Sequence, residues 1–190
     1  QDARGESVEE KPPLECGYQR RSGLTFEGDA MDSVYVETTV LSYLTARRSR
    51  DIVIAGRQAV TREWWERRRD AFALFISDLV LDEALQGDPD AAGRRAETAA
   101  TIRVLSVDKE VESITALLVT SGIFPIRAAT DAAHIAIATR HGIDYLPTWN
   151  CSHLANAEII RNVSRLLSDH RFEAPTICIP AELMGESNDD

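Results

Sequence analysis

Three acidic side chains stand at positions where an α/β protein places its chemistry. Glu37 ends a β-branched stretch that begins at Val34, Glu83 lies in a short apolar helix after a buried strand, and Asp131 opens a later helix of small residues. Carboxylate oxygens are ligands that Mg²⁺ and Mn²⁺ prefer, and two such ions activate a water and steady the leaving oxygen of a phosphodiester. The three acids therefore predict metal-assisted phosphodiester hydrolysis, if the fold brings them together.

Each acid taken alone has a simpler explanation. Glu83 either points to solvent or pairs with an arginine, and Asp131 is well placed to cap its helix through the macrodipole. His134, three residues after Asp131, is more often a satisfied core histidine than a ligand. Carboxylates held close together repel, so a true cluster predicts that at least one of them has a raised pKa in the absence of a cation.

Apolar runs and helical periodicity alternate along the chain. Strands are predicted at 34–36, 71–76, 102–107, 143–146 and 176–179. Helices are predicted after Thr38 or Thr39 as the cap and at 57–70, 79–86, 89–100, 109–121, 130–141 and 157–170. Asp108 is the predicted cap of the helix at 109–121.

This order predicts an α/β fold, a three-layer α/β/α sandwich with a mostly parallel central sheet. Neither a GxGxxG turn nor the P-loop pattern is present. In open parallel sheets, ligands bind at the carboxyl ends of the strands. Glu37 and the polar turn that begins at Thr148 both follow strands, so they are expected at that edge.

The chain of 190 residues predicts one domain, residues 33–183, between a tail at 1–32 read as disordered or loosely attached and a polar tail at 184–190. A net charge of -10 argues against binding nucleic acid by electrostatics alone. The three cysteines have no CxxC spacing, which favours a reducing cytoplasm, and no apolar run has transmembrane length. A zinc site is only weakly indicated by Cys151 and His153.

Four motifs in this order resemble the PIN domain and, within that family, the VapC-like toxins of type II toxin–antitoxin modules. They are VYVETTVLSYL at 34–44, LVLDE at 79–83, DAAHIAIA at 131–138 and YLPTWN at 145–150. Each motif is short, but four of them with this spacing are specific together. The resemblance covers about residues 33–183 and implies a metal-dependent ribonuclease fold.

The resemblance assigns roles to five residues of this chain. Glu37, Glu83 and Asp131 match the family's first three acids, Asn150 stands where many members have a fourth acid, and Thr148 matches the Ser or Thr two residues before it. Two departures follow, because the first acid is usually Asp and the fourth position here is an amide. Asn150 still offers a carbonyl oxygen to Mg²⁺ but contributes no charge, so a second ion is expected to bind more weakly.

The resemblance also implies partners: an RNA substrate, a cognate antitoxin and a second copy of the chain in a homodimer. Arg47, Arg48 and Arg127 are candidates to contact RNA phosphates. Trp64 and Trp65 either form an interface with a second copy or an antitoxin, or pack in the core.

Two other functions are weighed against the nuclease. The first alternative is a non-catalytic PIN-like module that binds RNA or a protein. Glu37 and Asn150, the two departures from the family pattern, would then mark a weakened site. An unrelated phosphatase or nucleotide-binding protein is disfavoured, since the first strand lacks an Asp nucleophile and the phosphate-binding loops are missing.

Overall fold

The structure, a computed structural model, describes residues 31–185. Its centre is a five-stranded sheet in the order β3-β2-β1-β4-β5, and every strand pair is parallel. The strands are β1 (Ser33–Tyr35), β2 (Ala73–Ser77), β3 (Arg103–Leu105), β4 (Tyr145–Pro147) and β5 (Thr176–Cys178). The predicted class, an α/β fold with a parallel sheet, is confirmed.

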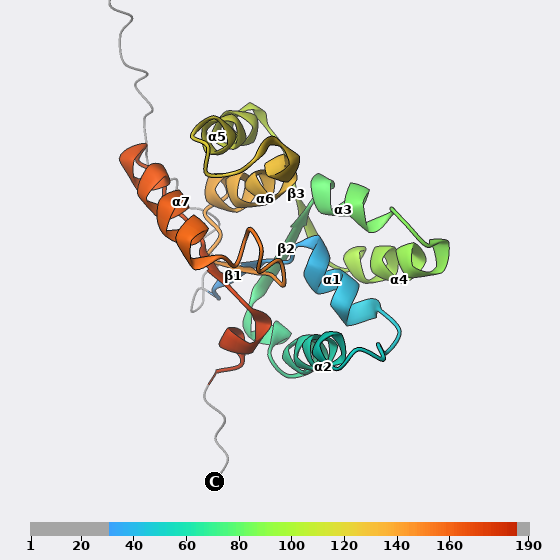
Figure 1. The fold of residues 1–190 in the computed structure, drawn as a ribbon. Coiled ribbons are helices and arrows are strands. Elements are labelled where there is room, and N and C mark those ends of the chain that lie inside the picture. Colours follow the sequence, from blue (N-terminus) through green and yellow to red (C-terminus); the bar gives the residue numbers. More distant parts are fainter. Residues whose placement is uncertain (1–30, 186–190) are drawn as a thin grey trace, which may run out of the picture.

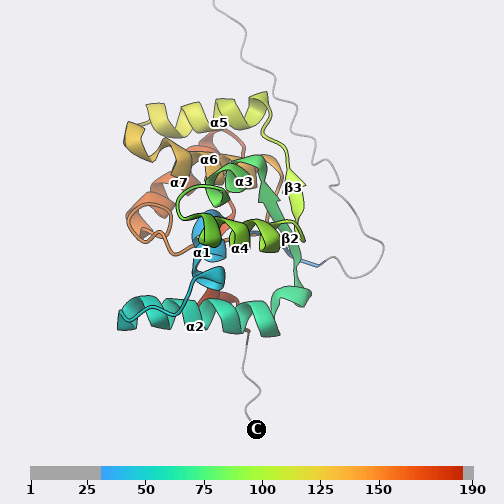
Figure 2. The same cartoon turned by 90° about the vertical axis from the view of Figure 1, so that its right-hand side faces the viewer.

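Helices cover both faces of the sheet and make the three layers (Figure 1). One face carries α1 (Thr38–Thr45), α2 (Ile52–Arg67), α3 (Asp78–Ala84) and α4 (Pro89–Ala99). The other carries α5 (Lys109–Thr120), α6 (Ala129–Arg140) and α7 (Ala157–Asp169). Seen from the side, α5 and α2 lie at opposite ends of the molecule, with α3, α4 and α6 between them (Figure 2). Short 3-10 turns occupy 69–71, 126–128 and 180–183.

The central strand β1 is the most enclosed part of the sheet. Val34 and Tyr35 have no exposed surface, and Val34 pairs with Leu74 of β2 on one side and Tyr145 of β4 on the other. From β1 the chain goes to β2 and β3 on one side, and later returns to β4 and β5 on the other. The strand order therefore reverses between β1 and β4, and in such sheets ligands bind outside the carboxyl ends at that point.

The start of α2 differs from the prediction. The helix begins at Ile52, five residues before the predicted start at Arg57, because the Asp51 side chain accepts hydrogen bonds from the backbone N–H groups of Val53 and Ile54. The helix also ends at Arg67, before the predicted end at Asp70. Trp64 has no exposed surface and Trp65 only 9%. Core packing therefore explains both tryptophans.

Two predicted helix caps are wrong, and the reason matters for the site. Helix α1 is capped by Glu37 itself, and neither Thr38 nor Thr39 serves as its cap. Helix α6 begins at Ala129 with no side-chain cap, so Asp131 lies within its first turn. Asp131 is therefore not the side-chain cap of α6, although its place in the first turn still lets it gain from the macrodipole.

The remaining boundaries agree with the sequence to within a few residues. Asp108 caps α5 through the N–H groups of Glu110 and Val111, as predicted. Within residues 31–185, no helix is both long and apolar enough to cross a membrane. The tail predicted at 1–32 lies outside the described residues except for its last two, and the C-terminal tail lies outside them from residue 186.

Candidate active site

Glu37 joins the end of β1 to the start of α1. Its Oε2 accepts the backbone N–H of Thr39 at 2.8 Å, and its Oε1 accepts the Thr39 hydroxyl. A carboxylate at a helix N-terminus gains from the unpaired N–H groups and the macrodipole there. Glu37 is nevertheless only 2% exposed, so the fold holds this acid rigidly and almost out of reach of water.

Glu83 enters the site from α3 and is held by a histidine. Its Oε2 accepts His134 Nε2 at 3.1 Å and the hydroxyl of Thr38. Because the carboxylate only accepts, Nε2 donates this bond, and His134 Nδ1 is hydrogen-bonded to the Tyr35 hydroxyl at 2.9 Å. His134 is 2% exposed and both its ring nitrogens are bonded, which confirms the core-histidine interpretation. The alternatives for Glu83, solvent or an arginine partner, are wrong.

The buried hydroxyl of Tyr35 is hydrogen-bonded to the other ring nitrogen of that histidine. It lies 2.6 Å from Ser77 Oγ as well as 2.9 Å from His134 Nδ1, and the ring has no exposed surface. Burial raises the pKa of Tyr35, and the charges of Glu37 and Glu83 raise it further, so the hydroxyl stays a proton donor. Both glutamates therefore act on one buried phenol.

Tyr35→Phe is expected to lower the free energy of unfolding by about 1–3 kcal/mol, the cost of leaving buried polar groups without a partner. The aromatic ring is kept, so the loss reports the hydroxyl alone. Urea denaturation of both proteins measures it. Tyr43→Phe is the matched control, because the Tyr43 hydroxyl makes only a 3.4 Å contact from Arg57 at a partly exposed position. Equal losses in the two variants would contradict the role of the buried hydroxyl.

Asp131 lies in the first turn of α6 and faces the turn that follows β4. Asn150 Nδ2 donates to its Oδ1 at 2.8 Å, and His153 Nδ1 donates to its Oδ2 at 2.7 Å. Asn150 is fixed in turn, because its Oδ1 accepts the His153 backbone N–H at 3.3 Å. The Asp131 and His153 side chains keep 19% and 29% of their surface exposed, so a ligand can reach this end of the site.

Thr148 begins the turn that joins the two halves of the site. Its hydroxyl accepts the Asn150 N–H at 3.0 Å, and the backbone N–H of the next residue, Trp149, donates to Thr39 Oγ1, which itself donates to Glu37. The turn after β4 therefore connects the two acids across the point where the strand order reverses: Asn150 donates to Asp131, and the Trp149 N–H reaches Glu37 through the Thr39 hydroxyl. All five residues singled out from the sequence lie at this edge of the sheet.

The acids differ in their electrostatics. Burial raises the pKa of the Glu37 carboxyl, despite the nearby His134 charge and the hydrogen bonds it accepts. Burial also acts to raise the pKa of Glu83, but the hydrogen bond and charge of His134 outweigh it, so that pKa is lowered. A raised pKa was expected in an acidic cluster, and Glu37 has one. Its cause is burial and not, as expected, repulsion between carboxylates.

Whether a divalent cation fits this site depends on the carboxylate and amide oxygens that lie at this edge of the sheet. Within residues 31–185 no group of three or more His, Cys, Asp or Glu side chains is arranged to hold one ion, so there is no preformed cage of three acids. Mg²⁺, however, is usually held by one or two carboxylates, with water and substrate phosphates completing its shell. The donors at this edge, three carboxylates and an amide, have the chemistry for such a site.

The sequence interpretation missed several residues of this arrangement. His153 was considered only as a weak zinc ligand with Cys151, yet it holds Asp131. Its position in the polar turn after a strand was the available signal, since that turn had to lie at the carboxyl edge. The roles of Tyr35 and Thr38 had no signal of their own, because both residues suit a strand or a helix start.

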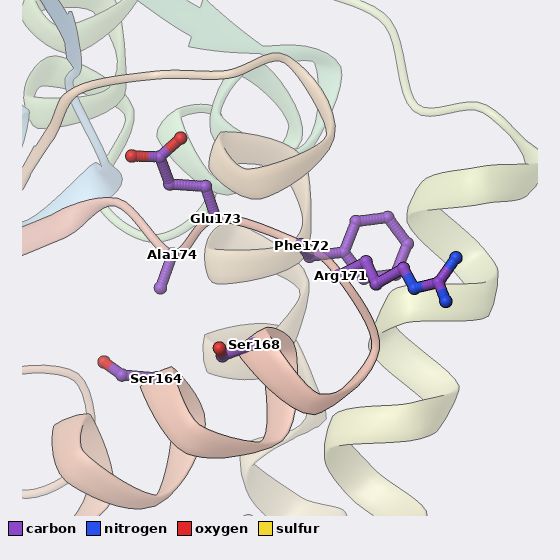
Figure 3. A pocket seen from close by; sticks show the side chains of 6 residues that line it. All are labelled: Ser164, Ser168, Arg171, Phe172, Glu173 and Ala174. Atoms are coloured by element: carbon purple, nitrogen blue, oxygen red, sulfur yellow. The ribbon is translucent and has the colours of Figure 1, made fainter. Parts of the chain in front are cut away.

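Two surface hollows in the described structure lie away from these five residues. One, of about 440 Å³, is lined by the end of α7 and the segment after it: Ser164, Ser168, Arg171, Phe172, Glu173 and Ala174. Its Arg171 and Glu173 side chains point away from each other (Figure 3). The other, of about 610 Å³, is an apolar groove between α3, α5 and α6. Neither contains a residue of the candidate site.

Fold and site together define a parallel α/β domain with a carboxylate site at its switch point. Among solved structures, the chain is similar to VapC20 of Mycobacterium tuberculosis, a toxin that cleaves the sarcin-ricin loop: 18% identity, 66% of this chain and 95% of that one, TM-score 0.49. It is also similar to PAE2754 from Pyrobaculum aerophilum: 21% identity, 77% and 97% coverage, TM-score 0.43. Neither a family model nor a curated protein matches the sequence. At these identities the similarities concern the fold alone.

Proposed function

We propose that the protein is a divalent-metal-dependent endoribonuclease of the PIN, VapC-like toxin type. The observation that carries the proposal is the turn after β4, which hydrogen-bonds Asp131 through Asn150 and reaches Glu37 through Trp149 and Thr39, at the switch point of a parallel sheet. Sites of hydrolysis in such folds are built from side chains that different strands bring to this edge. Glu83, fixed by His134, adds a third carboxylate.

The residues of the chain would position the reacting groups. Glu37, Glu83 and Asp131, with the Asn150 carbonyl, are the donors that would hold Mg²⁺ or Mn²⁺, which when bound supplies Lewis-acid chemistry to a phosphodiester. Thr148 and Asn150 are locked by their own hydrogen bonds and would orient the carboxylates beside them. His153 holds Asp131 through Nδ1, and its Nε2 makes no hydrogen bond within the described residues, so it is open to a ligand.

The resemblance of the sequence motifs to VapC-like toxins extends the proposal to binding partners and to the cellular compartment. We expect RNA as the substrate, a cognate antitoxin as an inhibitor, a homodimer as the working form and the cytoplasm as the compartment. Arg47, Arg48 and Arg127 are still candidates for phosphate contacts; all three are exposed, and Arg47 lies 3.5 Å from Asp90.

A non-catalytic module that binds RNA or a protein is the second candidate. It is favoured by one observation: every acid of the site already accepts hydrogen bonds from the protein, and Glu37 is nearly closed to solvent. Binding of Mn²⁺, measured by calorimetry on wild type, separates the two candidates, because a pure binding module has no need of the ion.

Removal of the metal tests the proposal directly. Purified wild-type protein, free of partner proteins, is incubated with a pool of structured and unstructured RNA in Mn²⁺ and in EDTA. Cleavage is expected with Mn²⁺, none with EDTA, and recovery when Mn²⁺ is added in excess of the chelator. The acidic edge repels RNA phosphates unless a cation neutralises it, which is the reason for the strict dependence.

Two results would contradict the nuclease. Folded protein that cleaves nothing with either Mg²⁺ or Mn²⁺ would leave the binding module as the better description. Cleavage that continues in EDTA would mean that the carboxylates do not act through a divalent ion.

A further inference from the structure

Arg57 of α2 lies against the aromatic side chain next to the site. Its guanidinium carbon is 5.4 Å from the centre of the Trp149 ring, a cation–π distance. One guanidinium nitrogen is 3.4 Å from the Tyr43 hydroxyl and the other 3.9 Å from Cys151 Sγ. The Tyr43 and Trp149 rings are themselves 6.0 Å apart in an edge-on arrangement. The arginine is therefore oriented in advance, by neutral groups only.

The hydrogen-bonding capacity of this guanidinium is hardly used. It has five N–H donors, and both of its contacts are long ones to weak acceptors. Within residues 31–185 it makes no ion pair with an acid. Its neighbours differ, because Arg62 bonds the backbone oxygen of Ala46 at 2.7 Å and Arg94 that of Thr45 at 2.9 Å. Arg57 is partly exposed and keeps its charge available for a ligand.

Trp149 fixes the arginine in relation to the acids. It stands between Thr148 and Asn150, its backbone N–H donates to Thr39 Oγ1 at 2.9 Å, and its indole N–H donates to Thr61 of α2 at 2.8 Å. The ring is 9% exposed, so Arg57 covers one side of a nearly buried platform. Asn150, the next residue, bonds Asp131. The guanidinium thus lies beside the turn that holds the exposed end of the site.

A cation at this place answers an electrostatic need of the proposed function. The chain has a net charge of -10, and its site is acidic. An RNA strand that reaches such a site needs a positive group next to it, and a guanidinium is the side chain best matched to phosphate oxygens. Since Arg57 is held by ring and hydroxyl contacts, little side-chain entropy is lost when it binds.

We infer that Arg57 is a substrate-binding residue. It holds the phosphate of a single-stranded RNA that neighbours the phosphate bound at the carboxylates. This inference rests on the proposed function in that RNA is taken as the ligand. Trp149 and Tyr43 are its positioning residues, because they act through the guanidinium. Among the residues that the structure describes, Arg47, Arg48 and Arg127 have no such platform.

The test measures RNA binding apart from cleavage. All proteins carry Asp131→Asn, so that the RNA stays intact, and a gel confirms it. A fluorescein-labelled single-stranded RNA of about 12 nucleotides, within the span that single-strand sites cover, is titrated at several salt concentrations in Mg²⁺ buffer. The variants are Arg57→Gln, Arg57→Lys and, as matched control, Arg67→Gln, which removes the same charge from an exposed end of the same helix where Arg67 pairs with Glu63.

Arg57→Gln is expected to weaken binding about tenfold, as the loss of one charge-assisted hydrogen-bonding group does. The slope of log K against log salt is expected to become shallower by about 0.7, the value for one phosphate contact on a single strand. Arg57→Lys keeps the positive charge but loses the two-pronged guanidinium, so its affinity is expected to lie between those of the parent protein and Arg57→Gln. The affinity of Arg67→Gln is expected to stay near that of the parent. In proteins with Asp131 intact, Arg57→Gln should raise KM with kcat little changed.

Unchanged binding by Arg57→Gln would overturn the inference. A loss of affinity with an unchanged salt slope would also overturn it, because stacking on a base and not a phosphate contact would then be lost. Tryptophan fluorescence and thermal melting check that Trp149 keeps its position in the variants. If Arg57→Gln displaces Trp149, the comparison of RNA binding is made with Arg57→Lys instead. If wild type never cleaves RNA but the Arg57 effects appear, the nuclease fails and the phosphate site stands. If wild type cleaves and Arg57→Gln binds normally, only the inference fails.

Discussion

Asp131→Asn is expected to lower the rate of RNA cleavage between about a hundredfold and a thousandfold, because it removes a charged ligand of the ion that would stabilise transition-state charge, and the loss of one such preorganised stabilising group costs about that much. The substitution keeps the shape of the side chain. Its oxygen can still accept one of the two hydrogen bonds, from Asn150 Nδ2 or His153 Nδ1. What is lost is the negative charge of a side chain that a ligand can reach.

The measurement is single-turnover cleavage in Mn²⁺, with thermal melting to show that the variant is folded. Asp169→Asn is the control, because Asp169 is exposed at the C-terminal end of α7. The chain leads from there to the start of β5, so Asp169 lies toward the amino ends of the strands and the candidate site toward their carboxyl ends. We expect the control to cleave like wild type. Equal rates for wild type and Asp131→Asn would place the active site elsewhere or indicate a contaminating nuclease.

Glu37→Gln is expected to make the protein more stable and, at the same time, to abolish cleavage. The pKa of Glu37 is raised by burial, so its ionised form is disfavoured in the folded state. A group with a raised folded pKa contributes stability below its unfolded pKa and loses it as the pH rises through the folded value. At neutral pH the wild-type carboxylate therefore costs stability, and a neutral amide of the same shape does not carry this cost.

The melting temperature of Glu37→Gln in EDTA is expected to exceed that of wild type at pH 8, with each 1 kcal/mol of stability appearing as about 2–4 °C in a chain of this size. The difference should narrow toward pH 4, as wild-type Glu37 becomes protonated. Glu66→Gln, at an exposed position of α2, serves as the control and should show no such trend. A difference that is constant across this pH range would contradict the assignment. A functional carboxylate that costs stability is a common trade-off.

The local signals in the sequence determined the order of elements and the edge where the site lies. Alternating apolar runs and helical periodicity depend on neighbours a few residues apart, and Asp108 caps its helix through N–H groups two and three residues away. Once the sheet is parallel, the carboxyl ends of β1 and β4 must share one edge. The positions of Glu37, Thr148 and Asn150 at that edge follow from this rule alone.

The tertiary structure alone decided what each acid touches. Glu83 meets His134 across 51 residues of sequence, His134 meets Tyr35 across 99, and Trp149 meets Thr39 across 110. No periodicity encodes such pairs, because they depend on how α3, α6 and the turn after β4 pack around β1. For the same reason Asp131 looked like a helix cap, and Arg57 was read only as the start of a helix. Burial, which raises the pKa of Glu37, is likewise a property of the packed layers and not of the motif that contains it.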